Sequence, residues 1–582
     1  VTGSGNQIAG DLTIETDSTE TGTLTVGGAG SIAAADLTVT GTVINQGDIL
    51  IDNYASGGVA STLTVTSGTL TNVGLLQFLD TSTFGGARVF VGEIDNQGGT
   101  VQASVDATIT NTGTFNLSTG TLTVDGTSTL TIDGGTTVIG TGTTLTDNTG
   151  AKIDFTGAAI LALDSDTGIV ATDPTIAFGG QSDAVTVTTV DTGPYAFDLD
   201  TGALLTLSGN DVFDTTVDVN VAGSLEAEGA GNAVNGGLYI SGTGELAVLG
   251  YDGGGDATLT IAQGFVNDGV IRLNNEGPAA HDTTLTVTSG AIDNFGTIVI
   301  EDTSAAGGLR TLSSDINNSG GTIDINTDAL IANTGRTFDT ASGTLDVGTS
   351  ILTVNGGETV LGTGTSFTGT GALDIAGTAD LTLDEGFDLL ATGPDLLLSG
   401  SVTIDGTASE GAAELYIGDG KTLTLDGDTV TGSVNLSVEG ILQIEGTDTI
   451  IDGQTFVYGP NGVINIPAGA SVAINNNIDL SGGTINVAAG AVLNLNGAEI
   501  LNGGLITGEG TISLFNGATI SDSTLAAVYD RVKSLRGALV NVGEMEALLV
   551  HFVRVHSRLQ MPARFGPGAL APRVSSPVST GT

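Results

Sequence analysis

The feature that most constrains this chain is a duplication with a period of about 220 residues. The segment STLTVTSGTLTNVG (61 to 74) returns as TTLTVTSGAIDNFG (283 to 296), and GGAR (85 to 88) returns as GGLR (307 to 310). The members of both pairs lie 222 positions apart. Self-similarity at a fixed long period is typical of repeat architectures, in which each copy stacks on the next.

We therefore divide the chain into five parts. These are the end of a preceding unit (1 to 19), a first repeat unit (20 to 241), a second unit (242 to 460), a partial third unit (461 to 525) and a tail (526 to 582). The tail holds 7 of the 13 Lys and Arg residues, and its helical spacing of apolar residues predicts a partly helical, partly disordered segment. A cap on the repeat body, a docking or assembly element, and a stretch foreign to the native reading frame stay open as interpretations.

Short β-branched runs such as LTI (12 to 14) and ILI (49 to 51), separated by Gly, Asn, Asp and Ser, fill each copy. They predict strands of about three to five residues. A string of β-sandwich domains would need linkers and large core aromatic residues at fixed places, and the sequence shows neither. We therefore predict an all-β fold, a parallel β-solenoid (β-helix) built from the duplicated units. At about 22 residues per turn it would have roughly 24 turns and a length on the order of 115 Å.

The tripeptide Asn-x-Gly marks both copies with the same spacings of 27, 24 and 15 residues. Asn and Gly tolerate left-handed backbone angles, which suits corners, and stacked Asn side chains can hydrogen-bond from turn to turn. We predict that these residues are structural corner and ladder positions. The predicted ladder residues are Asn45, Asn72, Asn96, Asn111, Asn267, Asn294, Asn318 and Asn333.

The segments INQGDILI (44 to 51), TNVGLLQF (71 to 78), TNTGTFNL (110 to 117) and DNFGTIVI (293 to 300) carry a family resemblance. They resemble the Asn-x-Gly-x-Ile/Leu turns of secreted bacterial β-solenoids, namely autotransporter passengers, filamentous-haemagglutinin-like adhesins and surface filament proteins. The likeness covers residues 1 to 525. It implies an extracellular or bacterial cell-surface location and a role in adhesion, biofilm matrix or filament formation, with the export route left open.

The formal net charge of −52 excludes whole classes of partner. Nucleic acid and anionic membranes need a Lys/Arg surface, so we expect neither as a partner. The absence of Cys excludes disulfides and thiolate chemistry. No apolar run is long enough to predict a transmembrane helix.

Acidic turns suggest one metal ion. DSDTG (164 to 168) and FDLDTG (197 to 202) place carboxylates two residues apart before a glycine, as calcium loops do, and GYDGGGD (250 to 256) is similar to one unit of a calcium-binding β-roll. Solvated turns are the simpler interpretation. The candidate Ca²⁺ ligands are Asp164, Asp166, Asp198, Asp200, Asp252 and Asp256.

Catalysis has little support in this sequence. Polysaccharide-cleaving β-helices combine carboxylates with Arg, Lys or His, and the two basic residues that recur in both copies are Arg88 and Arg310. We interpret both as turn cations that pair with a neighbouring carboxylate, and we expect no catalytic residues.

We therefore expect an extracellular, non-enzymatic structural rod that self-associates end to end into a surface or matrix filament. One alternative is a monomeric autotransporter-type adhesin passenger that binds a cell-surface or glycan ligand through loops such as 52 to 61 and 274 to 282. A polysaccharide-degrading enzyme is the second alternative.

Overall fold

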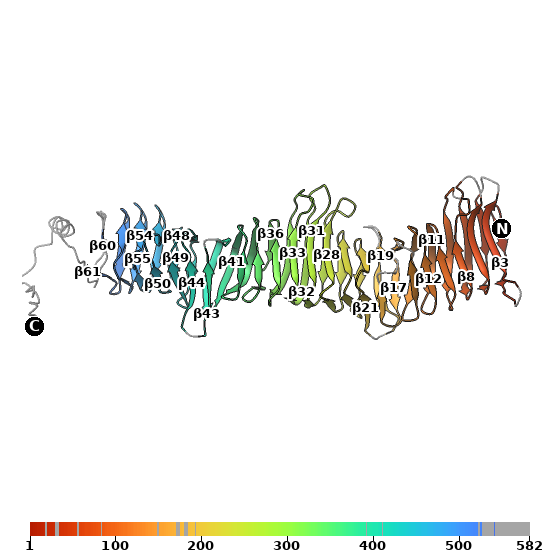
Figure 1. Cartoon of the computed structure of the whole chain (residues 1–582), viewed down its shortest axis with the longest axis horizontal. Coiled ribbons are helices and arrows are strands. Elements are labelled where there is room, and N and C mark those ends of the chain that lie inside the picture. Colours follow the sequence, from red (N-terminus) through yellow and green to blue (C-terminus); the bar gives the residue numbers. More distant parts are fainter. Residues whose placement is uncertain are drawn as a thin grey trace, which may run out of the picture.

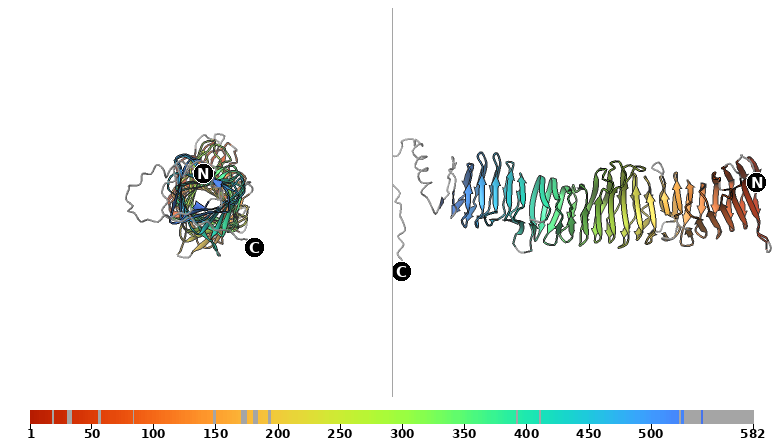
Figure 2. Two further views of the ribbon diagram at one scale, coloured as in Figure 1. Left: turned by 90° about the vertical axis from the view of Figure 1, so that its left-hand side faces the viewer. Right: turned by 45° about the horizontal axis from the view of Figure 1, so that its top comes forward.

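The computed structural model describes residues 1–17, 20–29, 34–54, 58–82, 84–147, 150–169, 175–179, 184–191, 194–390, 393–409 and 411–521, together with two short strands at 524–525 and 540–541. It is an all-β rod whose strands run across the long axis (Figures 1 and 2). The chain winds through about 20 turns, and its strands pair in parallel with those of the turns before and after. The predicted parallel β-solenoid is confirmed. No helix occurs in the described residues, and the tail predicted to be partly helical lies outside them apart from the short strand at 540–541.

Each turn contributes strands to three faces, which the chain visits in the fixed order A, B, C. Long strands such as β7 bend at a corner, so that their first part lies on one face and their second part on the next.

Face A is formed by β1 (Asn6–Ile8), β4 (Ala35–Val39), the first parts of β7 (Ser61–Asn72), β9 (Arg88–Asp95) and β11 (Ala107–Asn116), β13 (Thr129–Asp133), β16 (Lys152–Thr156), β19 (Thr175–Phe178), β22 (Leu204–Leu207), β25 (Ser224–Glu228), β28 (Glu245–Gly250), β31 (Val270–Asn275), β33 (Thr297–Glu301), β35 (Thr322–Ile325), β38 (Thr344–Asp346), β40 (Ser366–Thr368), β42 (Gly386–Leu389), β44 (Ala413–Ile417), β47 (Val434–Val438), β50 (Thr455–Val457), β53 (Ile478–Asp479), β56 (Glu499–Leu501), β59 (Thr519–Ser521) and β61 (Val540–Asn541).

Face B is formed by β2 (Leu12–Ile14), β5 (Val43–Asn45), the second parts of β7, β9 and β11, β14 (Thr136–Ile139), β17 (Ile160–Leu163), β20 (Thr186–Thr189), β23 (Val212–Phe213), β26 (Asn232–Val234), β29 (Ala257–Ile261), the first parts of β32 (Thr283–Asn294), β34 (Arg310–Asn317), β39 (Ile351–Gly362), β41 (Ala372–Asp384) and β43 (Asp395–Thr407), and by β36 (Ala329–Ala332), β45 (Thr422–Asp426), β48 (Ile441–Glu445), β51 (Val463–Ile466), β54 (Thr484–Val487), β57 (Leu505–Thr507) and β60 (Thr524–Leu525).

Face C is formed by β3 (Thr23–Ala29), β6 (Asp48–Tyr54), β8 (Leu75–Phe78), β10 (Thr100–Ala103), β12 (Thr121–Val124), β15 (Thr144–Asp147), β18 (Thr167–Ile169), β21 (Tyr195–Leu199), β24 (Val217–Val221), β27 (Leu238–Ile240), β30 (Phe265–Asn267), the second parts of β32, β34, β39, β41 and β43, β37 (Thr337–Asp339), β46 (Thr429–Val430), β49 (Thr449–Ile451), β52 (Ser471–Ile474), β55 (Val492–Asn496) and β58 (Thr511–Phe515).

The interior is one continuous hydrophobic core from Ile14 to Ile520. Residues alternate along each strand between buried and partly exposed, because successive side chains of a β-strand point to opposite sides. The sequence leads us to expect Val, Ile, Leu and Ala inside. The structure adds phenylalanine, and Phe155, Phe178 and Phe213 form edge-to-face and tilted ring contacts in the core.

Six of the marker asparagines form two buried ladders. Asn45 Nδ2 donates to Asn72 Oδ1 and Asn72 Nδ2 to Asn96 Oδ1, both at 2.7 Å. The second copy repeats this chain of amides at the same distances through Asn267, Asn294 and Asn318. The other two markers donate to backbone instead, Asn111 to Thr136 O and Asn333 to Gly356 O.

Close packing explains the glycine of several Asn-x-Gly markers. At Gly74 and Gly296 a Cβ atom would collide with the carbonyl oxygens of Gly47 and Gly269 in the turn before. The left-handed backbone that we expected for the asparagines is wrong, because none of the eight has a positive φ. At Gly98, Gly320 and Gly335, by contrast, the glycine of the marker has a positive φ and a Cβ would meet no clash, so the expected left-handed backbone is confirmed for these glycines.

The duplicated segments do not lie on the same face. Arg88 begins β9 on face A, and face A then continues by pairing through β11, β13, β16, β19, β22, β25, β28 and β31 to β33. Arg310 begins β34, which follows β33 on face B. One repeat therefore takes nine turns and one further face.

The amide ladder should be a major source of stability. We expect Asn294→Ala to lower the free energy of unfolding by about 2 kcal/mol or more, because it deprives two buried amides of their side-chain partner. Circular dichroism during thermal unfolding measures this. Asn317→Ala is the matched control. Asn317 lies on the outer surface of the next turn and donates to Asp293 Oδ1, one residue before Asn294. Equal losses in the two variants would contradict the role of the ladder.

Candidate functional site

The most elaborate polar structure in the described residues is a loop network that occurs in both copies. In the first copy the loop between β8 and β9 closes around Arg88, whose side chain is only 1% exposed. Its Nε donates to Leu79 O at 2.7 Å, and its Nη2 lies 3.2 Å from Asp80 Oδ1. Asp80 Oδ2 in turn accepts the amide of Gly85 at 2.7 Å. The loop is thus folded back on a buried guanidinium.

The second copy builds the same loop between β33 and β34. Arg310 is fully buried, donates from Nε to Glu301 O at 3.1 Å and lies 3.3 Å from Asp302 Oδ1. Asp302 also accepts hydrogen bonds from Ser304 Oγ and the amide of Gly307, both at 2.7 Å. Burial acts to raise the pKa of Asp302, but these hydrogen bonds and Arg310 outweigh it and hold the pKa below its ordinary value.

A second segment in each copy fastens this loop to the turn before. Asp52 Oδ1 accepts the amide of Thr81 at 2.8 Å, and in the second copy Asn274 Oδ1 accepts the amide of Thr303 at 3.0 Å. We call residues 52–54, 58–60, 79–82 and 84–87 loop platform 1, and residues 274–282 and 301–309 loop platform 2.

These platforms include loop 274 to 282 and most of loop 52 to 61, both predicted as a binding face; residues 55–57 lie outside the described residues. Figures 1 and 2 show the loop that leads from β8 to β9 and the loops that follow β31 and β33 rising on the same side of the rod. Large apolar side chains are exposed on both platforms, namely Tyr54 at 44% and Phe84 at 62% on loop platform 1 and Leu309 at 45% on loop platform 2. The platforms therefore project on the same side of the rod, and each carries exposed apolar side chains.

Sequence reasoning found Arg88 and Arg310 and their pairing with a neighbouring carboxylate, but it missed the rest of the network. A signal was present, because LDTS (79 to 82) returns as EDTS (301 to 304) at the same offset as GGAR and GGLR. Since both guanidiniums are buried within loops, neither is available for chemistry at the surface.

Within the described residues, the structure does not gather three of the candidate Ca²⁺ ligands at one point. Asp164, Asp166 and Asp200 lie exposed, and Asp198 lies on the outside of face C, where its Oδ1 accepts Asn220 Nδ2 at 2.7 Å. Asp166 Oδ1 accepts the amide of Ala196 at 3.0 Å. In the part of the chain that the structure describes, no three acidic, His or Cys side chains form a group that could hold a metal ion.

The remaining two candidate ligands face an imidazole. Asp252 Oδ1 lies 3.1 Å from His281 Nε2, and Asp256 Oδ1 lies 3.9 Å from His281 Nδ1. These contacts tie the loop after β28 to loop platform 2.

An acidic column lies beside loop platform 2 on face A. Burial raises the pKa of Glu226 to about 7, and the nearby carboxylates of Glu228, Glu276 and Glu245 add to the rise. Arg272 relieves part of this repulsion, since it bridges Glu245 of the preceding turn and Glu301 of the following one.

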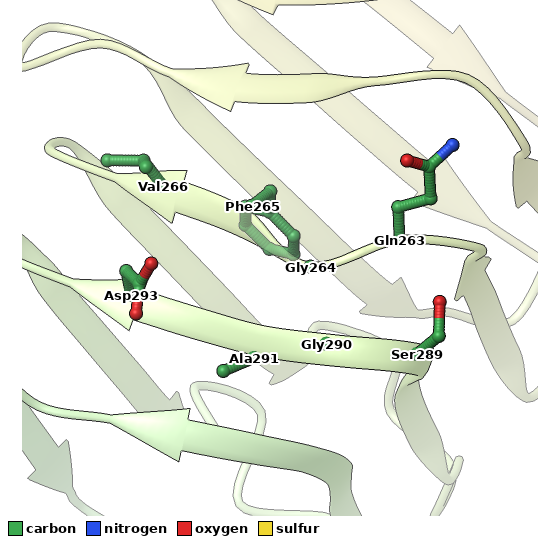
Figure 3. Close-up of a pocket in the computed structure, with 8 residues that line it drawn as sticks. All are labelled: Gln263, Gly264, Phe265, Val266, Ser289, Gly290, Ala291 and Asp293. Atoms are coloured by element: carbon green, nitrogen blue, oxygen red, sulfur yellow. The ribbon is translucent and has the colours of Figure 1, made fainter.

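One surface depression is open and chemically plain. Figure 3 shows it between β30 and β32, lined by Gly264, Phe265 and Gly290 among others. Asp293 is the one ionisable side chain that lines it. It offers no catalytic or metal-binding group set.

Comparisons with family models, curated proteins and solved structures give no match for this chain. No described helix has the length and apolar character needed to cross a membrane. Any functional conclusion therefore depends on the geometry.

We expect Arg310→Ala to lower the free energy of unfolding by about 3 to 5 kcal/mol, because it leaves the buried Asp302 without its cation. Thermal unfolding and limited proteolysis of residues 301–309 measure the effect. Lys152→Ala is the control, because Lys152 is 41% exposed in its pair with Asp154 and should cost at most about 1 kcal/mol. A small loss for Arg310→Ala would show that the loop does not depend on this pair.

Glu226 predicts a pH dependence of stability. Its folded pKa of about 7 lies above the ordinary 4.5, so between these values the folded state binds more protons and stability falls as pH rises. Glu226→Gln should leave stability at pH 4 unchanged and raise it at pH 8 by about 1 kcal/mol, after allowance for partial solvent screening. Melting curves at both pH values test this. The exposed Glu445→Gln should show no such gain, and a gain of equal size there would refute the assignment.

Proposed function

We propose that this protein is an extracellular, non-enzymatic structural rod that self-associates end to end into a surface or matrix filament. The observation that supports this most is the single hydrophobic core from Ile14 to Ile520. A continuous core through about 20 turns makes one stiff body, about 100 Å long at 4.8 Å per turn. Such a body spans distance, which suits a structural role.

The charge distribution favours contact at the ends over contact along the sides. With 65 acidic and 13 basic residues, two rods lying side by side repel each other. At the first turn, Ile8, Leu12 and Ile14 direct backbone hydrogen bonds to the next turn. The backbone groups of the alternate residues Gln7 and Thr13 point away from that turn and pair with no strand of the described residues. A strand from a second copy of this chain can therefore pair with them.

A second candidate is an adhesin passenger, and the loop platforms favour it. Loops that project on one side and carry Phe84 and Leu309 at exposed positions resemble anchors for a partner. Both candidates use the same rod and differ in whether copies join.

The edge of the first turn provides the test. We expect the purified chain to form fibres with an axial repeat near 4.8 Å in electron microscopy. The double variant Gln7→Pro, Thr13→Pro removes two outward amide donors and should leave single rods of about 100 Å. The control Gln7→Ala, Thr13→Ala keeps those amides and should still form fibres.

Discrete rods from the unchanged chain would overturn end-to-end assembly and favour the adhesin. Fibres from the proline variant would show that association uses another surface. Loss of fibres after chelation of calcium would show that the acidic turns bind the ion.

A further inference from the structure

A pair of aromatic rings lies on the outside of face A in the last third of the rod. Along β50 and the residue after it, Thr455 and Val457 are buried, whereas Phe456 is half-buried and Tyr458 is 37% exposed. The two rings are parallel, with an interplanar angle of 3° and centroids 6.0 Å apart. The other ring pairs in the described residues each include at least one ring buried in the core.

Oriented oxygen atoms border the ring pair in the preceding turn. Val457 pairs in register with Val438 of the preceding turn. The next residues along the two chains, Tyr458 and Glu439, therefore lie side by side. Tyr416 donates its hydroxyl to Glu439 Oε2 at 2.7 Å and so fixes that carboxylate. This hydrogen bond also raises the pKa of Tyr416 to about 12, so the phenol stays a donor.

The following turn borders the rings on their other side. Asp479 pairs in register with Phe456. Its Oδ1 accepts Ser481 Oγ at 2.7 Å and its Oδ2 accepts Asn502 Nδ2 at 2.6 Å. A ring pair thus lies between two carboxylates whose positions are held by hydrogen bonds.

This combination has a specific chemical complement. A sugar ring presents C–H groups on its faces, which pack on aromatic rings, and hydroxyl groups around its edge, which donate to carboxylates. Hydrogen bonds to ionised acceptors are also the stronger kind. A sugar that carries carboxylate or sulfate would be repelled by Glu439, Asp479 and the rod as a whole.

We propose that the patch formed by Phe456, Tyr458, Glu439 and Asp479 binds a neutral sugar residue of a glycan. The patch is small, so one site binds weakly. The inference does not depend on end-to-end assembly, since the patch lies on the side of the rod.

Saturation-transfer NMR and isothermal titration with cellohexaose, maltohexaose and chitohexaose in its N-acetylated form test the proposal. We expect at least one of these neutral probes to bind with Kd of about 1 mM, and hexagalacturonate not to bind. Tyr458→Ala should weaken binding about tenfold, whereas Tyr458→Phe should keep most of it.

Tyr239→Ala is the matched control. Tyr239 is 39% exposed and donates its hydroxyl to Asp268 at 2.7 Å, but it has no ring partner among the described residues. We expect this variant to bind like the unchanged chain. No binding of any neutral probe, or equal binding by Tyr458→Ala and the unchanged chain, would overturn the proposal, as would an equal loss in Tyr239→Ala.

Discussion

Parallel hydrogen bonding between successive turns is the constraint on which the rest of this structure depends. It keeps neighbouring strands in register whatever the length of chain between them. One turn takes 19 residues from Val89 to Thr108, whereas another takes 31 from Asn6 to Leu37. The surplus residues leave the coil at its corners, and the core continues unbroken beneath them. The loop platforms are therefore insertions that the fold tolerates at little cost to its register.

The same constraint explains how far the sequence predicts this molecule. Short strands, the long repeat and the marker asparagines follow from local patterns, and they identify a solenoid. The number of strands in a turn does not follow, because no local pattern separates one strand that bends at a corner, such as β7, from two separate strands. For that reason the step of one face between Arg88 and Arg310 could not be predicted. The site followed in part, since the recurring cations were visible but their burial was not.

The shift of the duplicated segment by one face, from face A at Arg88 to face B at Arg310, has a structural consequence. Stacked strands twist, so nine turns rotate each face about the axis of the rod. Figures 1 and 2 show the two platforms on one side despite their different faces. A repeat of nine turns and one face thus offsets the twist and keeps duplicated loops co-directional. The amide ladders mark the same unit, since each begins with a buried, unpaired Oδ1, at Asn45 and at Asn267.

Electrostatics then limits what this rod can meet. Six basic residues precede the tail, and each has a partner in the fold. Arg88, Arg310 and Lys421 are buried in pairs with aspartates. Arg272 and Lys152 pair with acidic residues at the surface, and Arg336 donates to a backbone carbonyl. None of these six is left to attract an anion, while most acids point outward. The field along the sides is negative, so acidic surfaces and other rods are repelled laterally. Association through neutral backbone edges, and recognition of uncharged glycans on an aromatic patch, are the contacts that such a field permits.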